Sequence, residues 1–185
     1  MSEIILMICN LDYENTITFL AFVISLTAVF FTWKGLKIQR EHNYKSVKPI
    51  GRIRIADFES KIYAKIENSG IGPMILKGLT VYNGEKTNKS IIDAIPKELK
   101  ERILWTNFTS NYEDRAIPVN GSLDLIVWTI NSTYDDIPNQ IEIDREELRL
   151  ALKNLTVKIK YTDIYEENNF VEEQKFDWFG RNLEK

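Results

Sequence analysis

The chain has 185 residues with one histidine, one cysteine and a formal net charge of −3, and 28 % of its residues are Lys, Arg, Asp or Glu. The single cysteine excludes an intramolecular disulfide, and the single histidine excludes any site that needs two imidazole rings. The length is sufficient for one domain with a hydrophobic core of its own.

The first element along the chain is an apolar, charge-free run, residues 17–33. At about 1.5 Å per residue, a helix of this length approaches the roughly 30 Å hydrocarbon core of a bilayer. Tyr13 and Trp33 flank the run, where amphipathic rings favour the boundary between lipid and water. We therefore predict a transmembrane helix over residues 16–34.

Two other interpretations of the run are weighed against this one. A cleavable signal peptide has positive charge before its apolar region, whereas this chain has only acidic residues there, Glu3, Asp12 and Glu14. A core helix of a soluble domain is also apolar on all sides. The apolar run lies near the N-terminus between charge blocks of opposite sign, and this position favours a membrane helix instead.

The charges around the run predict its direction. Three acids precede it, and seven bases with only Glu41 against them follow within residues 34–54. Since basic residues stay on the cytoplasmic side, we predict a single-pass protein of the inner (cytoplasmic) membrane, with residues 1–15 outside and the C-terminal domain in the cytosol. The bilayer is one predicted partner, because bases near its surface attract anionic head groups. The residues predicted to make this contact are Lys34, Lys37, Arg40, Lys45 and Lys48.

One face of the predicted span is lined by small or hydroxylated side chains at alternating spacings of three and four. Such a face lets helices approach closely in lipid, and the heptad spacing suits a left-handed crossing. We predict self-association or a membrane partner through this stripe, although such residues are also ordinary in membrane helices. The stripe consists of Thr18, Ala21, Ser25, Ala28 and Thr32.

Residues 35–49 form a basic linker, in which the helix is expected to continue for two or three turns until Pro49 ends it. From residue 50 the apolar pattern changes to a period of two. Strands are predicted over residues 51–55, 62–66, 74–82, 104–109, 122–130, 155–162 and 170–178. Asn83 and Gly84 mark a turn, because both tolerate positive φ.

Two short helices interrupt the strands. Pro96 suits a first helical position and begins a helix that reaches Arg102. Asp144 and Glu147 form a start signal similar to a capping box for the second. Together these patterns predict a mainly β fold, an antiparallel immunoglobulin-like β-sandwich over residues 50–180 with a short tail, 181–185.

Three segments resemble those of a known group: residues 42–49 after the span, 68–73 between two strands and 117–122 before a later strand. The combination resembles uncharacterised short bacterial single-pass membrane proteins with a cytosolic immunoglobulin-like β-sandwich domain. The resemblance implies a location and a fold and no particular activity.

The segment 68–73 also has a physical interpretation of its own. Gly70 and Gly72 allow backbone angles that other residues avoid, and Pro73 fixes the start of the next strand. Together with Asn68 they predict a shaped structural loop that links strands or crosses between sheets. A glycine-rich phosphate cradle is the alternative, but no helix and no Lys-Ser/Thr pair follows.

No catalytic or metal-binding signature stands out, so we predict neither an enzyme nor a cofactor. His42 lies in the basic linker, which favours a head-group or capping contact over catalysis. Carboxylates cluster in expected loops, but their spacing matches no known calcium loop and favours solvated turns. These carboxylates are Asp135, Asp136, Glu142, Asp144, Asp163, Glu166 and Glu167.

The sequence therefore favours a membrane-anchored, non-catalytic binding or assembly module, in which one helix tethers a cytosolic sandwich that binds a protein partner or self-associates. The alternative is a membrane effector of the antiphage or toxin type, whose soluble domain senses a ligand and whose helices cluster to perturb the bilayer. Nucleic acid is not a predicted partner. Subtracting the −3 before the run and the +6 after it from the total of −3 leaves −6 for residues 55–185, and an acidic domain repels phosphate.

Overall fold

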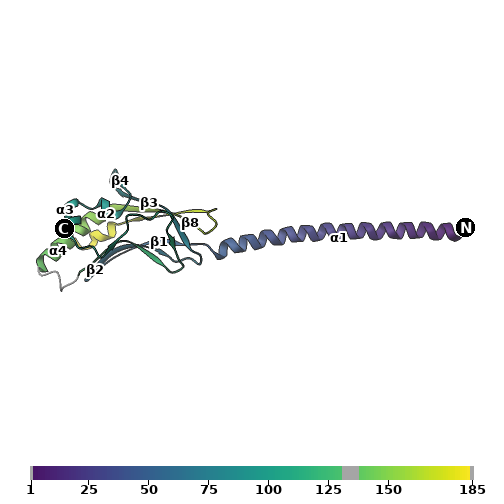
Figure 1. Ribbon diagram of the computed structural model, residues 1–185, viewed down its shortest axis with the longest axis horizontal. Coiled ribbons are helices and arrows are strands. Elements are labelled where there is room, and N and C mark those ends of the chain that lie inside the picture. Colours follow the sequence, from purple (N-terminus) through teal and green to yellow (C-terminus); the bar gives the residue numbers. More distant parts are fainter. Residues whose placement is uncertain (1, 131–137, 184–185) are drawn as a thin grey trace. The chain divides into compact units, whose positions relative to one another are not determined.

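The computed structural model describes residues 2–130 and 138–183 and divides the chain into two compact units, Met1–Ser46 and Val47–Lys185 (Figure 1). The first unit is a single helix, α1 (Ser2–Ser46), of 45 residues. It includes the predicted span and continues through most of the predicted linker. It ends shortly before Pro49, which agrees with the restriction that a proline places on the residue before it.

The apolar part of α1 is open to its surroundings. All side chains from Tyr13 to Asn43 are exposed, and the apolar window within Tyr13–Ser46 is 0 % buried. A core helix would be mostly buried, so that interpretation of residues 17–33 is wrong for this structure. By length and composition, this helix is sufficient to cross a membrane.

The second unit consists of two antiparallel sheets and a few short helices. One sheet has the order β1-β2-β7-β5, and the other has the order β4-β3-β8-β9 with β6 paired to β3. The strands of the first sheet are β1 (Gly51–Phe58), β2 (Lys61–Asn68), β5 (Asn107–Phe108) and β7 (Ser122–Thr129). Those of the second are β3 (Met74–Asn83), β4 (Lys86–Asn88), β6 (Ala116–Ile117), β8 (Leu155–Thr162) and β9 (Asn169–Lys175).

Most predicted strands are present, and two need correction. The predicted strand 104–109 is reduced to β5, because Leu104 is 84 % exposed and the segment meets β7 only briefly. The predicted strand 170–178 ends at Lys175, and Trp178 lies in a 3₁₀ helix, η1 (Asp177–Asn182). The turn after β3 is as expected, with Gly84 at φ 59°.

The core lies between the sheets and follows from the period-two pattern. Alternate side chains of the central strands face inward and are fully buried, so each contributes roughly 1.5–3 kcal/mol of hydrophobic free energy. Examples are Ile62 and Ile66 on β2, Leu76 and Val81 on β3, and Val157 and Ile159 on β8.

Helices close one end of this unit, opposite the β8–β9 turn (Figure 1). They are α2 (Ile91–Ala94), α3 (Lys97–Arg102) and α4 (Pro138–Lys153). The predicted start of the last helix at Asp144 is wrong, since Asp144 lies in the middle of α4. Instead of capping a helix, the Asp144 carboxylate accepts a bond from Gln140 Nε2 at 2.8 Å and pairs with Arg102 Nε at 2.6 Å.

The buried face of α4 gives a test of this packing. Leu152 is fully buried in the core, whereas Leu150 on the same helix is 45 % exposed. We expect Leu152→Ala to lower the free energy of unfolding by about 2–5 kcal/mol, because it leaves a cavity, and Leu150→Ala by well under half of that. Urea unfolding of the full chain in detergent, followed by tryptophan fluorescence, measures both. Equal losses would contradict the packing of α4.

Candidate functional site: the Asn68 junction

Two of the segments that suggested a resemblance, 68–73 and 117–122, meet residues 47–51 at one buried residue, Asn68, at the end of β2. The segment that follows it, residues 69–73, crosses from the first sheet to the second, since β2 and β3 belong to different sheets. Residues 47–51 begin the second unit, and residues 117–121 form the turn between β6 and β7. We call these three segments, with Asn68, the Asn68 junction.

The Asn68 side chain bonds to all three segments. Its Oδ1 accepts from the backbone N–H of Ile50 at 3.3 Å and of Gly70 at 3.0 Å. Its Nδ2 donates to the carbonyls of Gly72 at 2.8 Å, Ile117 at 3.1 Å and Pro118 at 3.3 Å. The Asn side chain suits this position because its carbonyl oxygen accepts hydrogen bonds and its NH₂ group donates them.

Backbone bonds strengthen the same contact. Ser69 N–H donates to the Ile50 carbonyl at 2.8 Å, and Ile71 N–H donates to the Lys48 carbonyl at 3.2 Å. Gly51 N–H donates to the Tyr161 hydroxyl at 3.0 Å. Burial raises the pKa of this hydroxyl above its usual value, so it remains a neutral acceptor. Gly51 and Tyr161 are 110 positions apart along the chain.

Gly70 and Gly72 are required by close approach of backbones. A Cβ on Gly72 would lie 1.9 Å from the Val47 carbonyl oxygen, and a Cβ on Gly70 would lie 2.4 Å from the Ile50 nitrogen. Real Cβ atoms do not come this close, and the atoms met are backbone atoms that cannot rotate away. The loop therefore fits against residues 47–50 only with glycine at both positions.

This geometry fixes the start of the second unit and offers little to a ligand. The N–H groups of Gly70 and Ile71, which a phosphate cradle would need, are already bonded to Asn68 and Lys48. The glycine-rich phosphate cradle is therefore not supported.

The hydroxyls of the predicted stripe are satisfied within α1. Thr18, Ser25 and Thr32 each donate to the carbonyl four residues earlier, at 2.8–2.9 Å. These side chains are exposed. A hydroxyl bonded in this way costs little in lipid and still offers oxygen lone pairs to a neighbouring helix.

The predicted lipid-contact residues fall into two groups. Lys34, Lys37, Arg40 and Lys45 are exposed on α1, and Lys45 Nζ bonds to Glu41 at 2.9 Å. Lys48 belongs to the second unit, where its Nζ lies 5.6 Å from the centre of the Phe170 ring. Lys48 thus has a partner within the protein.

The carboxylates of the acidic clusters make hydrogen bonds and salt bridges that stabilise turns and helices. Asp163 is buried and accepts from Tyr165 N–H at 2.9 Å and Asn168 Nδ2 at 3.1 Å, which fixes the β8–β9 turn. Glu166 pairs with Lys77 at 3.0 Å. Asp135 and Asp136 lie outside the described residues. Among the residues that the structure describes, no three of His, Cys, Asp and Glu are grouped so as to hold a metal ion.

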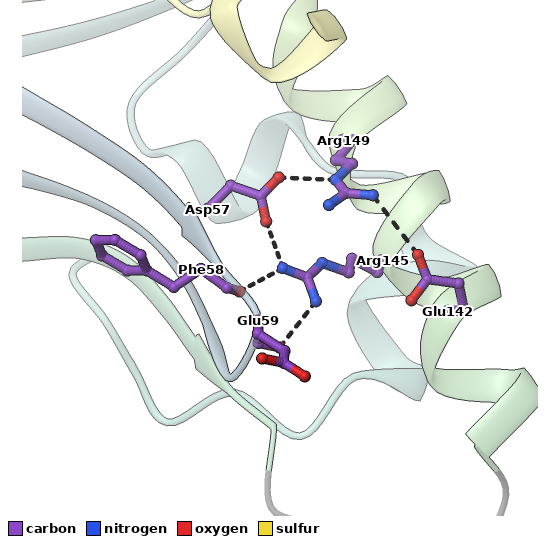
Figure 2. Close-up of polar contacts among 6 residues, drawn as sticks. All are labelled: Asp57, Phe58, Glu59, Glu142, Arg145 and Arg149. Carbon is purple, nitrogen blue, oxygen red and sulfur yellow. Dashed lines mark hydrogen bonds and ion pairs between the residues drawn. The ribbon is translucent and has the colours of Figure 1, made fainter. Parts of the chain in front are cut away.

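A buried charge cluster, which the sequence did not suggest to us, fastens α4 to the far end of β1. Figure 2 shows Arg145 and Arg149 pointing from α4 to Asp57, whose side chain is 2 % exposed. Asp57 Oδ1 accepts from Arg145 at 2.7 Å, and Oδ2 accepts from Arg149 Nε at 2.8 Å. Arg145 also donates to the carbonyls of Phe58 and Glu59.

The signal for this cluster was present in the sequence. Asp57 continues the alternation of Ile53 and Ile55 and so points inward, and the two arginines are one helical turn apart beside the core residues of α4. Burial by itself raises the pKa of the Asp57 carboxyl. The hydrogen bonds from Arg149 and Arg145 outweigh that effect and hold this pKa below its usual value.

Comparison with known proteins adds no assignment. No family model matches the chain, and no curated protein and no solved structure is significantly similar to it. The function is therefore argued from the sequence and the geometry.

The close approach at Gly72 can be tested against a second glycine in the same unit. We expect Gly72→Ala to destabilise the full chain by about 2 kcal/mol or more, because the methyl group meets the Val47 backbone. Gly78→Ala is the control, since its Cβ meets nothing closer than 3.6 Å, and it should change stability by less than about 1 kcal/mol. Thermal unfolding measures both, and an unchanged Gly72→Ala variant would contradict the junction geometry.

The buried carboxylate predicts a pH dependence. Because the pKa of Asp57 is lower in the folded state, its contribution is complete above the unfolded pKa of about 3.9 and is lost as the pH falls through the folded pKa. Asp57→Asn removes this acid dependence. Because it leaves Arg145 without a charged partner and Arg149 with only Glu142 at 3.7 Å, it should cost about 3–5 kcal/mol at pH 7.

Urea unfolding of the full chain between pH 7 and pH 3 measures both effects. Asp114→Asn is the control, since the Asp114 side chain is 76 % exposed and pairs with Lys77 at the surface. It should cost no more than about 1 kcal/mol. An Asp57→Asn variant that keeps the stability and acid sensitivity of the unaltered protein would contradict the cluster.

Proposed function

We propose that this protein is a membrane-anchored, non-catalytic assembly module of the inner membrane. In this proposal α1 crosses the bilayer with its N-terminal end outside, and the second unit stands in the cytosol, where it self-associates or binds a protein partner. The observation that carries the proposal is the exposed apolar surface of α1. Burying the exposed side chains of residues 17–33 in lipid removes their apolar surface from water. In this proposal, that hydrophobic free energy holds the chain in the membrane.

The charge pattern and the hydroxyl bonds of α1 support the same placement. Bases follow the apolar run and acids precede it, as the positive-inside rule requires for a cytosolic C-terminal unit. The hydroxyls of Thr18, Ser25, Thr27 and Thr32 are bonded to backbone carbonyls, so they enter lipid without an unsatisfied donor. Small side chains on one face leave room for a second helix.

The form of the second unit belongs to the proposal as an immunoglobulin-like sandwich. Its strand orders, β1-β2-β7-β5 and β4-β3-β8-β9, correspond to the orders ABED and C′CFG of immunoglobulin sheets. In this correspondence α4 occupies the connection between strands E and F. Sandwiches of this kind commonly present loops and strand edges to protein partners, which favours binding over catalysis.

One observation favours a second candidate, the membrane effector. A tether needs only a flexible connection, whereas a sensor must transmit a change in its soluble domain to its helix. The Asn68 junction holds residues 48–51 by backbone and side-chain bonds, which suits transmission. The same bonds are also compatible with an assembly module.

The test combines fractionation with variants of the stripe. We expect the full chain to sediment with membranes and to need detergent for release, and the second unit to resist protease in spheroplasts but not in lysed cells. Replacing Ala21, Ser25 and Ala28 with Leu should weaken self-association in membranes by about tenfold or more, because close approach of the helices is blocked.

The matched control replaces Val23, Thr27 and Phe30, which lie off the stripe, with Leu and should leave association unchanged. A chain that stays soluble and monodisperse without detergent would overturn the proposal. Induced leakage of the membrane that depends on the stripe would select the effector over the module.

A further inference from the structure

The chain contains two Asn-Gly pairs, Asn83-Gly84 and Asn120-Gly121, in different surroundings. Asparagine is among the chemically least stable residues, and a following glycine has no side chain to shield its backbone nitrogen from the asparagine amide. Both pairs lie in turns of the second unit, the first between β3 and β4 and the second between β6 and β7. The two pairs therefore share their covalent chemistry and differ in the contacts around them.

The first pair lies in an exposed turn. Gly84 has φ 59°, and no atom beyond its chain neighbours lies within 4 Å of the position that a Cβ would take. In the part of the chain that the structure describes, neither the Asn83 side-chain amide nor the Gly84 N–H makes a hydrogen bond. Asn83 ends β3 opposite Leu155 of β8, and on its other side it pairs with Lys86 of β4, a strand of three residues at the sheet edge. Little besides this short pairing restrains the turn.

The second pair is held by the Asn68 junction. The Gly121 N–H, which is the group that would react, donates to the Pro118 carbonyl at 2.9 Å. The Asn120 N–H donates to the Asn68 carbonyl at 3.0 Å, and the Gly121 carbonyl accepts from the Asn68 N–H at 3.0 Å. Movement of the Gly121 nitrogen toward the Asn120 side chain breaks its bond to Pro118 and displaces a peptide group that is bonded on both sides.

We propose that Asn83 is a site of spontaneous deamidation and that Asn120 is protected from the same reaction. The Gly84 nitrogen attacks the Asn83 Cγ, so that an N–Cγ bond forms, the Cγ–Nδ2 bond breaks, and ammonia leaves with the proton of the Gly84 N–H. Water then opens the resulting succinimide ring at one of its two carbonyl carbons. Opening at Cγ gives aspartate at position 83, and opening at the backbone carbon gives isoaspartate. Water is the only reagent consumed, and no group is oxidised or reduced.

The products change the β3–β4 hairpin. Both add a negative charge two positions before Glu85. In isoaspartate the main chain runs through Cβ and Cγ, which lengthens it by one carbon at the last residue of β3. Pairing register beyond that point then shifts, and β4 has only its three pairs with β3 to keep it in place. The modification therefore acts on β4, while the pairing of β3 with β8 before residue 83 is unaffected.

The experiment uses the full chain in detergent, incubated in mildly alkaline buffer and sampled over days by peptide mapping with mass spectrometry. Replacement of the amide NH₂ by a carboxylate oxygen raises the mass of the peptide that contains the modified asparagine. The same chain in concentrated urea is the matched control, because unfolding removes the surroundings of both pairs and leaves their chemistry identical. Asn83→Gln is a second control, since its side chain is longer by one methylene and closes a less favourable ring.

In the folded chain we expect deamidation at Asn83 to be at least about tenfold faster than at Asn120, because the release of even one hydrogen bond costs about this factor in rate. In urea the two rates should converge, and Asn83→Gln should abolish the mass gain of its peptide. Equal rates in the folded chain overturn the inference. So does a folded chain in which neither pair reacts, or a preference for Asn83 that persists unchanged in urea, since the cause would then be the local sequence.

Discussion

The hydrogen bonds of Asn68 are the constraint on which the start of the second unit depends. One buried amide joins the residues that follow α1, the loop between the two sheets and the turn before β7. A buried amide is costly unless each of its groups is bonded, and here both the oxygen and the nitrogen of the amide are bonded to backbone groups. Gly70 and Gly72 make the contact possible, since any side chain there would meet the backbone of residues 47–50.

The two ends of the sandwich are closed by different chemistry. Amide and hydroxyl hydrogen bonds hold the start of the second unit, including the bond from Gly51 to Tyr161. Salt bridges stabilise the other end, where Arg145 and Arg149 bind α4 to Asp57 (Figure 2). Between them the core consists of alternating aliphatic side chains. The pH dependence that Asp57 confers therefore belongs to the helical end of this unit.

These features bear on function through α1. A helix with exposed apolar side chains needs lipid or another helix to cover them. The stripe of small residues leaves room for a second helix, and lipid can cover the rest of the helix surface. Residues 48–51 are held in place within the second unit by the hydrogen bonds of the Asn68 junction.

The sequence by itself determined the long apolar helix, the direction of its charges and the positions of the central strands, because each depends on local composition and on a period of residues along one segment. It also predicted that residues 68–73 have a special shape, since the glycines signal it. It misplaced the start of α4 and the ends of two strands, because Asp144, Leu104 and Trp178 have local patterns that tertiary contacts override. Only the tertiary structure decided that Asn68 gathers three distant segments and that Asp57 holds two arginines. The bonds of Asn68 to Ile50, Ile117 and Pro118 and those of Asp57 to the arginines join residues 18 to 92 positions apart. Nothing in a local pattern specifies which distant backbone group or charge will be the partner.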